Sequence, residues 1–209
     1  MKKGLFITIE GIDGSGKTTQ QNKIEAYLKE QGFDVISTLE PGALETGKKI
    51  RNLLLNSKNE ISDRCEMFLF LADRANHIEQ LIEPALNAGK VILCDRHTDS
   101  TIAYQGFGRG QDAKLLKELN KIAVKGIEPD LTLLFDISAE AAAKRLNREK
   151  DRMEKAGLEF QKRVRNGYLE LQRENPARIK IINAESDADK VFEDVKSIIN
   201  ELIKRNRGN

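Results

Sequence analysis

The sequence predicts an α/β fold in which parallel strands form one sheet and helices cover both of its faces. Short runs of β-branched and other apolar residues alternate along the chain with longer segments of helical periodicity. Within each run the apolar residues follow one another almost without a break, which is typical of strands buried on both faces. Strands that alternate with helices are joined by right-handed crossovers into a parallel sheet. The five expected strands are residues 5–10, 33–39, 90–95, 131–136 and 178–183.

Helical segments are expected between and after these strands. They cover about residues 17–31, 46–57, 63–88, 112–125, 138–175 and 187–205, and the fifth is expected to break near Gly157. Because no linker or internal repeat interrupts the pattern, residues 1–209 are expected to form a single domain. Ligands bind at the carboxyl ends of the strands in such sheets, so the residues after each strand are the candidates for chemistry.

Composition excludes several classes of partner. The 35 basic and 33 acidic side chains nearly cancel, which gives no general case for binding nucleic acid or membrane surfaces. The apolar stretch near the N-terminus is too short for a signal peptide, and no run of about 18 apolar residues predicts a membrane span. Cys65 and Cys94 fit neither a zinc spacing nor a disulfide scaffold, so we expect reduced thiols and a cytoplasmic location.

A phosphate-binding loop follows the first expected strand. Gly11-Ile-Asp-Gly-Ser-Gly-Lys17-Thr18 matches the pattern G-x-x-x-x-G-K-[ST] in full. Its glycines permit a backbone that points N–H groups at phosphate oxygens, with Lys17 on the β- and γ-phosphates and Thr18 on magnesium. A chance glycine-rich turn is the alternative, which the strand before and the helix after the motif disfavour. The sequence therefore predicts a P-loop NTPase that binds ATP and Mg²⁺ through Gly11, Ile12, Asp13, Gly14, Ser15, Gly16, Lys17, Thr18 and Thr19.

The third expected strand ends at Asp95, which is followed by Arg96. A carboxylate at this strand tip is expected to hold magnesium beside the phosphate loop, directly or through water. A carboxylate that only caps a turn or a helix is the alternative. Arg96 is expected to clamp the phosphate of an acceptor with two parallel hydrogen bonds, although composition alone is equally compatible with a surface ion pair.

Residues 144–163 are dense in both acidic and basic side chains. Such a run is usually a solvated helical face with ion pairs between residues four apart. Phosphoryl transfer, however, needs positive charge on the transferring group and exclusion of water. We therefore expect a helical lid over about residues 144–157, with Arg148 and Arg152 as catalytic residues on one side of it; a plain surface helix is the alternative.

Further motifs occur in a fixed order along the chain. They are residues 6–19, Glu40-Pro41-Gly42, Phe70-Leu-Ala-Asp-Arg74 with His77, Asp95-Arg96-His97, residues 99–106, Gly108-Arg-Gly110, Pro129-Asp-Leu-Thr132 and Asp151-Arg152-Met-Glu154. This set resembles the thymidylate kinase family, of the nucleoside monophosphate kinase group, over nearly the whole chain, and the stretch 95–110 is its most specific part. The resemblance implies ATP-dependent phosphorylation of dTMP to dTDP in pyrimidine deoxynucleotide biosynthesis, by a homodimer.

The resemblance also implies how the acceptor is held. Phe70 is similar to the ring that stacks on thymine, and Tyr104 to the side chain that crowds the sugar 2′ position. Arg74 and Gln105 resemble the groups that read the edge of the base. The acceptor set implied in this way is Asp13, Glu40, Arg51, Phe70, Arg74, Arg96, Ser100, Thr101, Tyr104 and Gln105.

The same resemblance assigns roles around the two phosphate groups. Asp13 is similar to the acid that accepts a hydrogen bond from the acceptor 3′-hydroxyl, Arg51 and Arg96 to the pair that holds its phosphate, and Arg145 to a side chain that stacks on adenine. The catalytic set is Lys17, Asp95, Arg96, Arg148 and Arg152, and the metal ligands are Thr18 and Asp95. The acceptor phosphate is already ionised at neutral pH, so catalysis is expected to be positioning and charge neutralisation.

This sequence departs from the family pattern in places. The family's Arg-Glu-Pro-Gly-Gly-Thr is Leu39-Glu-Pro-Gly-Ala43-Leu44 here, so no basic contact is expected from that strand. His97 stands where the family has tyrosine or phenylalanine. Gly14 stands where some members carry a catalytic arginine, and the lid arginines match the other arrangement.

Three other functions compete with this interpretation. The nearest is a P-loop kinase for another nucleoside monophosphate or a nucleoside. A GTPase switch would need a guanine-reading Asn-Lys-x-Asp, and the nearest match, Asn120-Lys-Ile-Ala123, lacks the acid. An ATP-dependent DNA-partitioning or motor protein is disfavoured by the balanced charge.

Overall fold

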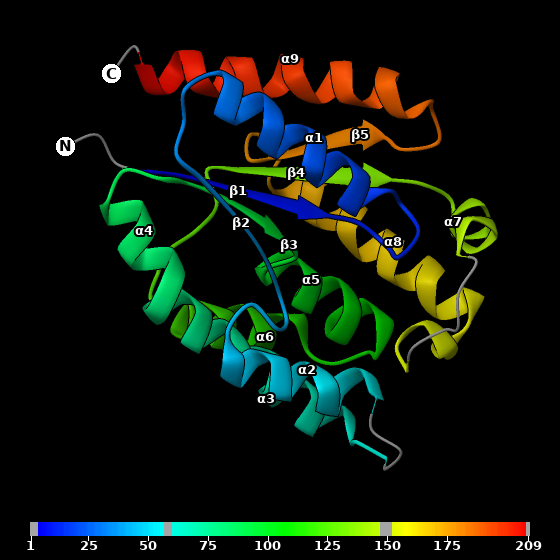
Figure 1. The fold of residues 1–209 in the computed structure, drawn as a ribbon. Helices are drawn as coiled ribbons and strands as arrows, with labels where there is room; N and C mark the ends of the chain where they lie inside the picture. Colours follow the sequence, from blue (N-terminus) through cyan, green and yellow to red (C-terminus); the bar gives the residue numbers. More distant parts are fainter. Residues whose placement is uncertain (1–3, 57–59, 147–151, 208–209) are drawn as a thin grey trace.

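The computed structural model describes residues 4–56, 60–146 and 152–207, and these contain one parallel sheet. Its strands are β1 (Leu5–Glu10), β2 (Val35–Leu39), β3 (Val91–Asp95), β4 (Leu131–Asp136) and β5 (Ile179–Asn183). Their order across the sheet is β2-β3-β1-β4-β5, with every neighbouring pair parallel (Figure 1). The predicted five-stranded parallel sheet is confirmed, with strand ends within two residues of those expected from the sequence.

Helices cover both faces of this sheet, as the sequence predicts. On one face α1 (Lys17–Glu30) and α9 (Ala188–Arg207) pack against each other (Figure 1). The other face carries the remaining longer helices (Figure 1). They are α2 (Glu45–Asn56), α3 (Asp63–His77), α4 (Glu83–Asn87), α6 (Ala113–Ala123) and α8 (Leu158–Glu174).

The helix expected at 63–88 is continuous but not uniform. A π-helical segment, η1 (Ile78–Ile82), joins α3 to α4. Pro84 follows it in the first turn of α4. Because proline has no N–H to donate to the carbonyl four residues earlier, the regular ladder is interrupted here, and the wider turn lies just before the proline.

The helix expected at 138–175 is broken at Gly157, as predicted, but its first part ends earlier, at Arg145. It consists of α7 (Ala139–Arg145), the short 3₁₀ turn η3 (Glu154–Ala156) and α8, and Gly157 has a φ of 93° immediately before α8. Arg148 lies outside the described residues.

The sequence did not predict α5 (Thr98–Thr101) or the π-helical η2 (Ile102–Gly108). Two glycines and a wide turn leave this segment without the periodicity of an ordinary helix.

The prediction that every strand is buried on both faces is wrong for β2 and β5. Strands β1, β3 and β4 are buried almost throughout, whereas β2 and β5 alternate buried with exposed positions. These two lie at the edges of the sheet, where helices cover less of the surface. The exposed side chains of Leu39 and Ile181 are the result.

The strand register brings the first and third strand ends together. Ile9 of β1 is paired with Asp95 of β3, and the Arg96 N–H donates to the Ile9 carbonyl at 2.9 Å. The Glu40 N–H donates to the Asp95 carbonyl at 2.9 Å, so the segment after β2 joins the same edge. Segments that are far apart in sequence therefore meet at one carboxyl edge, next to the phosphate loop.

The core between α1 and the sheet gives a test of the fold. Ile24 of α1 is 0% exposed and belongs to the main core cluster, whereas Ile122 of α6 is 75% exposed. Ile24→Ala should lower the free energy of unfolding by about 2–5 kcal/mol, since it removes buried methyl groups and leaves a cavity. Ile122→Ala should change it by less than about 0.5 kcal/mol. Urea unfolding measures both, and equal losses would contradict this packing.

Candidate active site

The phosphate loop connects β1 to α1 with a backbone that only glycine adopts easily. Gly14 and Gly16 have φ values of 85° and 87°. A Cβ on Gly14 would lie 2.5 Å from the Ala142 carbonyl oxygen, so a side chain there would clash with α7. Helix α1 begins at Lys17 directly after the loop. The positive end of its dipole and its free N–H groups make this turn a site for anions.

Lys17 is nearly buried, and its ammonium faces the loop itself. Its Nζ donates to the carbonyls of Gly11 at 3.2 Å and of Ile12 at 3.1 Å, and it has no direct ion pair among the described residues. Burial lowers the pKa of Lys17, and the nearby Arg96 lowers it further. A cation held by neutral carbonyls alone gains much from a phosphate oxygen nearby.

One cavity opens around this loop. Its lining residues are Asp13, Gly14, Gly16, Lys17, Thr18, Thr19, Leu39, Glu40, Arg51, Asp95, Arg96, Arg145 and Leu146. We call it the donor cavity. Gly11, Ile12 and Ser15 are not among the lining residues, and Arg145 donates to the Ala184 carbonyl at 2.8 Å.

The donor cavity contains a carboxylate suited to a cation. Asp95 Oδ1 is buried and has no hydrogen-bond partner among the described residues. The exposed Thr18 side chain lines the same cavity. Oxygen ligands of this kind, next to a phosphate site, fit Mg²⁺, which prefers one or two protein oxygens together with phosphate and water.

A second cavity lies next to the first, between α2, α3 and η2. Its lining residues are Asp13, Glu40, Pro41, Arg51, Leu55, Phe70, Arg96, Ser100, Thr101, Tyr104, Gln105 and Met153. We call it the acceptor cavity. Apolar and aromatic side chains form much of its wall, although seven of its twelve lining residues are polar or charged, so it suits a small flat ligand that also carries polar groups.

The two cavities share four lining residues, which are Asp13, Glu40, Arg51 and Arg96. Arg51 is anchored by a 2.8 Å hydrogen bond to the Pro41 carbonyl. Arg96 has a φ of 73°, a conformation that is unusual for a residue with a side chain and that often marks functional sites. Two guanidinium groups therefore stand where the cavities meet.

Arg96 is held in place from several sides. It donates to Asp13 Oδ1 at 2.6 Å and to the Gly11 carbonyl at 3.0 Å, and its guanidinium lies 4.9 Å from the centre of the Tyr104 ring. Tyr104 in turn donates to Asp13 Oδ2 at 3.1 Å. Burial opposes ionisation of Asp13, but Arg96 and Lys17 outweigh it and lower the pKa of Asp13. The phosphate loop and the acceptor cavity are thus joined through one ion pair.

Arg74 does not line either cavity. Its side chain is 1% exposed, and its Nε donates to Glu40 at 2.8 Å. Its other nitrogens donate to Thr101 and Asn120, both at 2.6 Å, and to the His97 carbonyl at 2.8 Å. Arg74 therefore supports Glu40 and Thr101, which do line the acceptor cavity. Asn120, the first residue of the incomplete guanine motif, is buried in this network.

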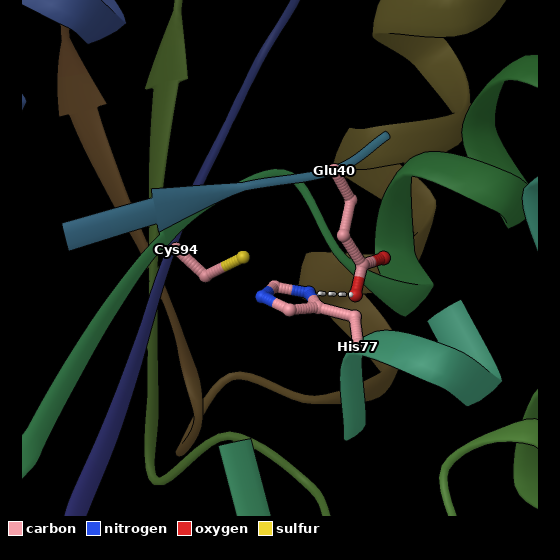
Figure 2. Close-up of side chains that lie close together, drawn as sticks. All are labelled: Glu40, His77 and Cys94. Carbon is pink, nitrogen blue, oxygen red and sulfur yellow. Dashed lines mark hydrogen bonds and ion pairs between the residues drawn. The ribbon is translucent and has the colours of Figure 1, made fainter. Parts of the chain in front are cut away.

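Glu40 also joins two buried histidines. Its Oε1 accepts from Nδ1 of His77 at 2.9 Å and of His97 at 3.1 Å. Figure 2 shows that the groups of Glu40, His77 and Cys94 point toward one another, and their potential ligand atoms all lie within 4.8 Å. Each is already hydrogen-bonded, because His77 Nε2 pairs with Thr38 and the Cys94 thiol donates to the Arg96 carbonyl. Burial also raises the pKa of Cys94, so the geometry is that of a hydrogen-bonded support under the site.

Arg152 lies apart from the donor cavity in this structure. Its Nε donates to the Leu54 carbonyl at 2.7 Å, and its guanidinium forms an ion pair with Glu66. The neighbouring Met153 lines the acceptor cavity. Within the described part of the expected lid, Arg145 and Leu146 therefore line the donor cavity and Met153 lines the acceptor cavity.

Comparison with known proteins agrees with this geometry. The family model for thymidylate kinase matches residues 9–195. The chain belongs to the thymidylate kinase family. It is 49% identical to a thymidylate kinase from Maridesulfovibrio salexigens, with 96% of this chain and 97% of the relative covered. It is 45% identical to one from Clostridium novyi, over 95% of this chain and 100% of that relative.

A solved structure from the same family has a similar fold. The crystal structure of thymidylate kinase from Ehrlichia chaffeensis has a TM-score of 0.78 and 34% identity, and the match covers 94% of this chain and 99% of that one. The family uses ATP as phosphate donor with a metal ion, and acts on small molecules rather than nucleic acid. Among the described residues no helix is both long and apolar enough to cross a membrane.

Sequence reasoning missed several residues that shape the site. Leu55 and Met153 line the acceptor cavity, and Tyr168 of α8 donates to Glu10 at 2.8 Å. Met153 follows Arg152 in a motif that the sequence analysis had already noted, which was a usable signal. No sequence signal indicated Tyr168, since it lies 158 positions from Glu10 on a helix with no motif.

Glu10, the last residue of β1, is buried and gives a prediction for pH dependence. It accepts hydrogen bonds from the His97 N–H at 2.7 Å and from Ser100 at 2.6 Å. Burial, together with the charge of Asp99, raises the pKa of Glu10 from its ordinary value of 4.5 to about 7. Because the folded chain favours the protonated acid, this group stabilises the fold below pH 4.5, and that contribution is lost as the pH rises through about 7.

Glu10→Gln should remove this dependence while it retains a polar side chain of the same shape. We expect the free energy of unfolding of the wild type, minus that of the variant, to decrease steadily from pH 4.5 to pH 7. Urea titrations at several pH values measure this difference in the free energy of unfolding. Contributions of other titrating groups, such as Asp73, are common to the two proteins and cancel in the difference. A difference that stays constant or increases over this range would show that Glu10 is not the titrating group.

Proposed function

We propose that this chain transfers the γ-phosphoryl group of ATP to dTMP, as expected of a member of the thymidylate kinase family. The observation that carries the proposal is the meeting of two cavities at Arg51 and Arg96. One cavity surrounds a phosphate loop, and the other is a slot lined by both apolar and polar side chains. A donor phosphate and an acceptor phosphate bound in them would face each other across these two guanidinium groups.

On the donor side, we propose that the loop from Gly11 to Thr19 wraps the ATP phosphates and that Lys17 bridges the β- and γ-phosphates. Thr18 and Asp95 would hold Mg²⁺, which would neutralise charge on the phosphate oxygens. Arg145 lies in the lining, where it could stack on adenine. Two observations support these roles: Asp95 Oδ1 has no hydrogen-bond partner among the described residues, and the Lys17 ammonium lies against the loop carbonyls of Gly11 and Ile12.

On the acceptor side, we propose that Phe70 stacks on the base and Gln105 meets its edge, with Ser100 and Thr101 next to it. Tyr104 would crowd the sugar 2′ position, and Asp13 would accept a hydrogen bond from the 3′-hydroxyl. All six residues line the acceptor cavity, which supports the assignment. Arg74 and Glu40 would act mainly as supports, because Arg74 is buried and donates to Glu40, Thr101, Asn120 and the His97 carbonyl.

For the transfer itself, we propose that Arg51 and Arg96 hold the acceptor phosphate in line with the γ-phosphate. The attacking oxygen is already ionised near neutral pH, so no strong general base is needed. Their charge would offset the repulsion between two anions as they approach. Asp13 keeps Arg96 at this position through the 2.6 Å ion pair.

We also propose that residues 144–157 act as a lid with Arg148 and Arg152 as its catalytic cations. Arg152 is bound to Glu66 in this structure and would have to leave it to reach the transferring group. Closure would exclude water, which otherwise competes as acceptor.

Three broader assignments belong to the same proposal. The described residues share one sheet, which supports a single domain over 1–209. Leu53 and Phe68 expose apolar side chains on the packed helices α2 and α3, which supports a homodimer that covers them. Cys65 and Cys94 are both free thiols, which supports a reducing cytoplasmic location.

A panel of acceptors tests the reaction. Purified chain with ATP and Mg²⁺ should phosphorylate dTMP faster than dUMP, UMP, CMP or AMP.

Lys17→Ala should lower kcat by about 10²–10³, because it removes a preorganised donor to the phosphates. Lys23→Ala is the matched control on the same helix, since Lys23 pairs with Asp189 outside the cavity and should leave kcat unchanged. Preference for another acceptor, or full activity of Lys17→Ala, would refute the assignment.

Phe70→Ala tests the base-stacking role. Loss of a ring that stacks on a base costs about 1–3 kcal/mol, so KM for dTMP should rise at least about fivefold. Phe192→Ala removes a ring from α9, away from the cavity, and should leave KM unchanged. Steady-state kinetics with varied dTMP measures both. An unchanged KM in Phe70→Ala would remove Phe70 from the acceptor site.

A further inference from the structure

Behind the acceptor cavity lies a carboxylate that no motif indicated. Glu66 of α3 is 0% exposed. Its Oε1 accepts a 2.9 Å hydrogen bond from Nε2 of Gln105 and a longer one of 3.4 Å from Nε of Arg109. Its Oε2 accepts from Nη2 of Arg109 at 3.2 Å and from Arg152. Glu66 does not line the cavity itself, whereas Gln105 does.

The charge state of Glu66 decides what Gln105 presents. Burial alone would raise the pKa of Glu66, but hydrogen bonds from Gln105, Arg109 and Arg152 outweigh it and lower the pKa. An ionised carboxylate accepts hydrogen bonds and donates none. The NH₂ group of Gln105 must therefore face Glu66, because the opposite amide orientation would place two acceptors against each other.

This orientation leaves the amide oxygen of Gln105 as the polar atom available to a ligand. No hydrogen bond to Gln105 Oε1 occurs within the described parts of the chain. An acceptor atom at the base edge pairs with a donor such as the N3–H of thymine or uracil. Cytosine carries an unprotonated N3 in the same place, and two facing acceptors repel.

We propose that Glu66 is a positioning residue that sets the orientation of the Gln105 amide and thereby selects acceptor bases with an N3–H over cytosine. The inference rests on the proposed dTMP kinase function and adds a determinant for that site. Glu66 touches no substrate; it acts through Gln105. Its second oxygen is occupied by two arginines, which keeps the carboxylate ionised and its first oxygen directed at Gln105.

The decisive variant is Glu66→Gln. A glutamine at this position can donate to Gln105 Oε1, which lets the Gln105 amide turn its NH₂ group toward the base. The ratio of kcat/KM for dTMP to kcat/KM for dCMP should fall by about tenfold to a hundredfold, as expected when an unmatched buried polar contact is removed or created. Arg109 and Arg152 are partly exposed and can turn to water, so the variant should fold.

Two further variants separate positioning from general damage. Glu66→Met removes the acceptor altogether and frees the amide to adopt either orientation, so the ratio should again fall. Arg109→Gln removes another partner of Glu66 but keeps the contact with Gln105, so the ratio should remain that of the wild type even if stability decreases. A purely structural role would lower both kcat/KM values together and leave their ratio unchanged in all three variants.

The outcomes distinguish this inference from the function on which it rests. If the wild type phosphorylates dTMP and the ratio is unchanged in both Glu66→Gln and Glu66→Met, the amide assignment is overturned alone. A ratio that falls equally in Arg109→Gln also overturns it, because the effect would then come from the loss of charge. If the wild type does not phosphorylate dTMP, the proposed function fails and this inference fails with it.

Discussion

The ion pair between Arg96 and Asp13 is the constraint on which the site depends. It connects the residue after β3 to the phosphate loop after β1, two neighbouring strands whose register is set by their ladder. The left-handed backbone of Arg96 directs its side chain back over the loop, and Tyr104 closes the same unit from η2. Without this pair, a partly buried guanidinium and a partly buried carboxylate would each lose its main charged partner, which is costly where water is only partly available to replace it.

Three buried glutamates lie at or behind the cavities, and each accepts hydrogen bonds from residues at or near the acceptor cavity. Glu10 accepts from Ser100, Glu40 from Arg74, and Glu66 from Gln105, and in each pair the donor residue is near or within the acceptor wall. An ionised carboxylate accepts hydrogen bonds and donates none, so Glu40 and Glu66 fix the direction of their donors. Ser100 and Gln105 line the acceptor cavity, whereas Arg74 lies behind it and supports Thr101. The three differ in charge, because the pKa of Glu10 is raised whereas those of Glu40 and Glu66 are lowered.

Local sequence patterns were sufficient to predict the sheet, the main helices and the phosphate loop. Each depends on hydrogen bonds or burial within a few residues, so periodicity and spacing carry the information. The acceptor wall was different, because Gln105 meets Glu66 across 39 positions and Arg152 meets it across 86. The burial of Arg74 was not predictable for the same reason, since its partners come from three separate segments. The edge strands were misjudged because apolar composition does not reveal sheet order.

The position of Arg152 links the wall of the acceptor cavity to the proposed lid. The same Glu66 carboxylate that orients Gln105 also binds Arg152, so the two interactions share one charge. If Arg152 moves to the transferring phosphoryl group, Glu66 keeps Arg109 as its cation, and the carboxylate remains ionised in a buried position. With this second arginine in place, the proposed lid could close while the Gln105 amide keeps its orientation. Base selection and phosphate chemistry would then be independent of each other, although they meet at one buried side chain.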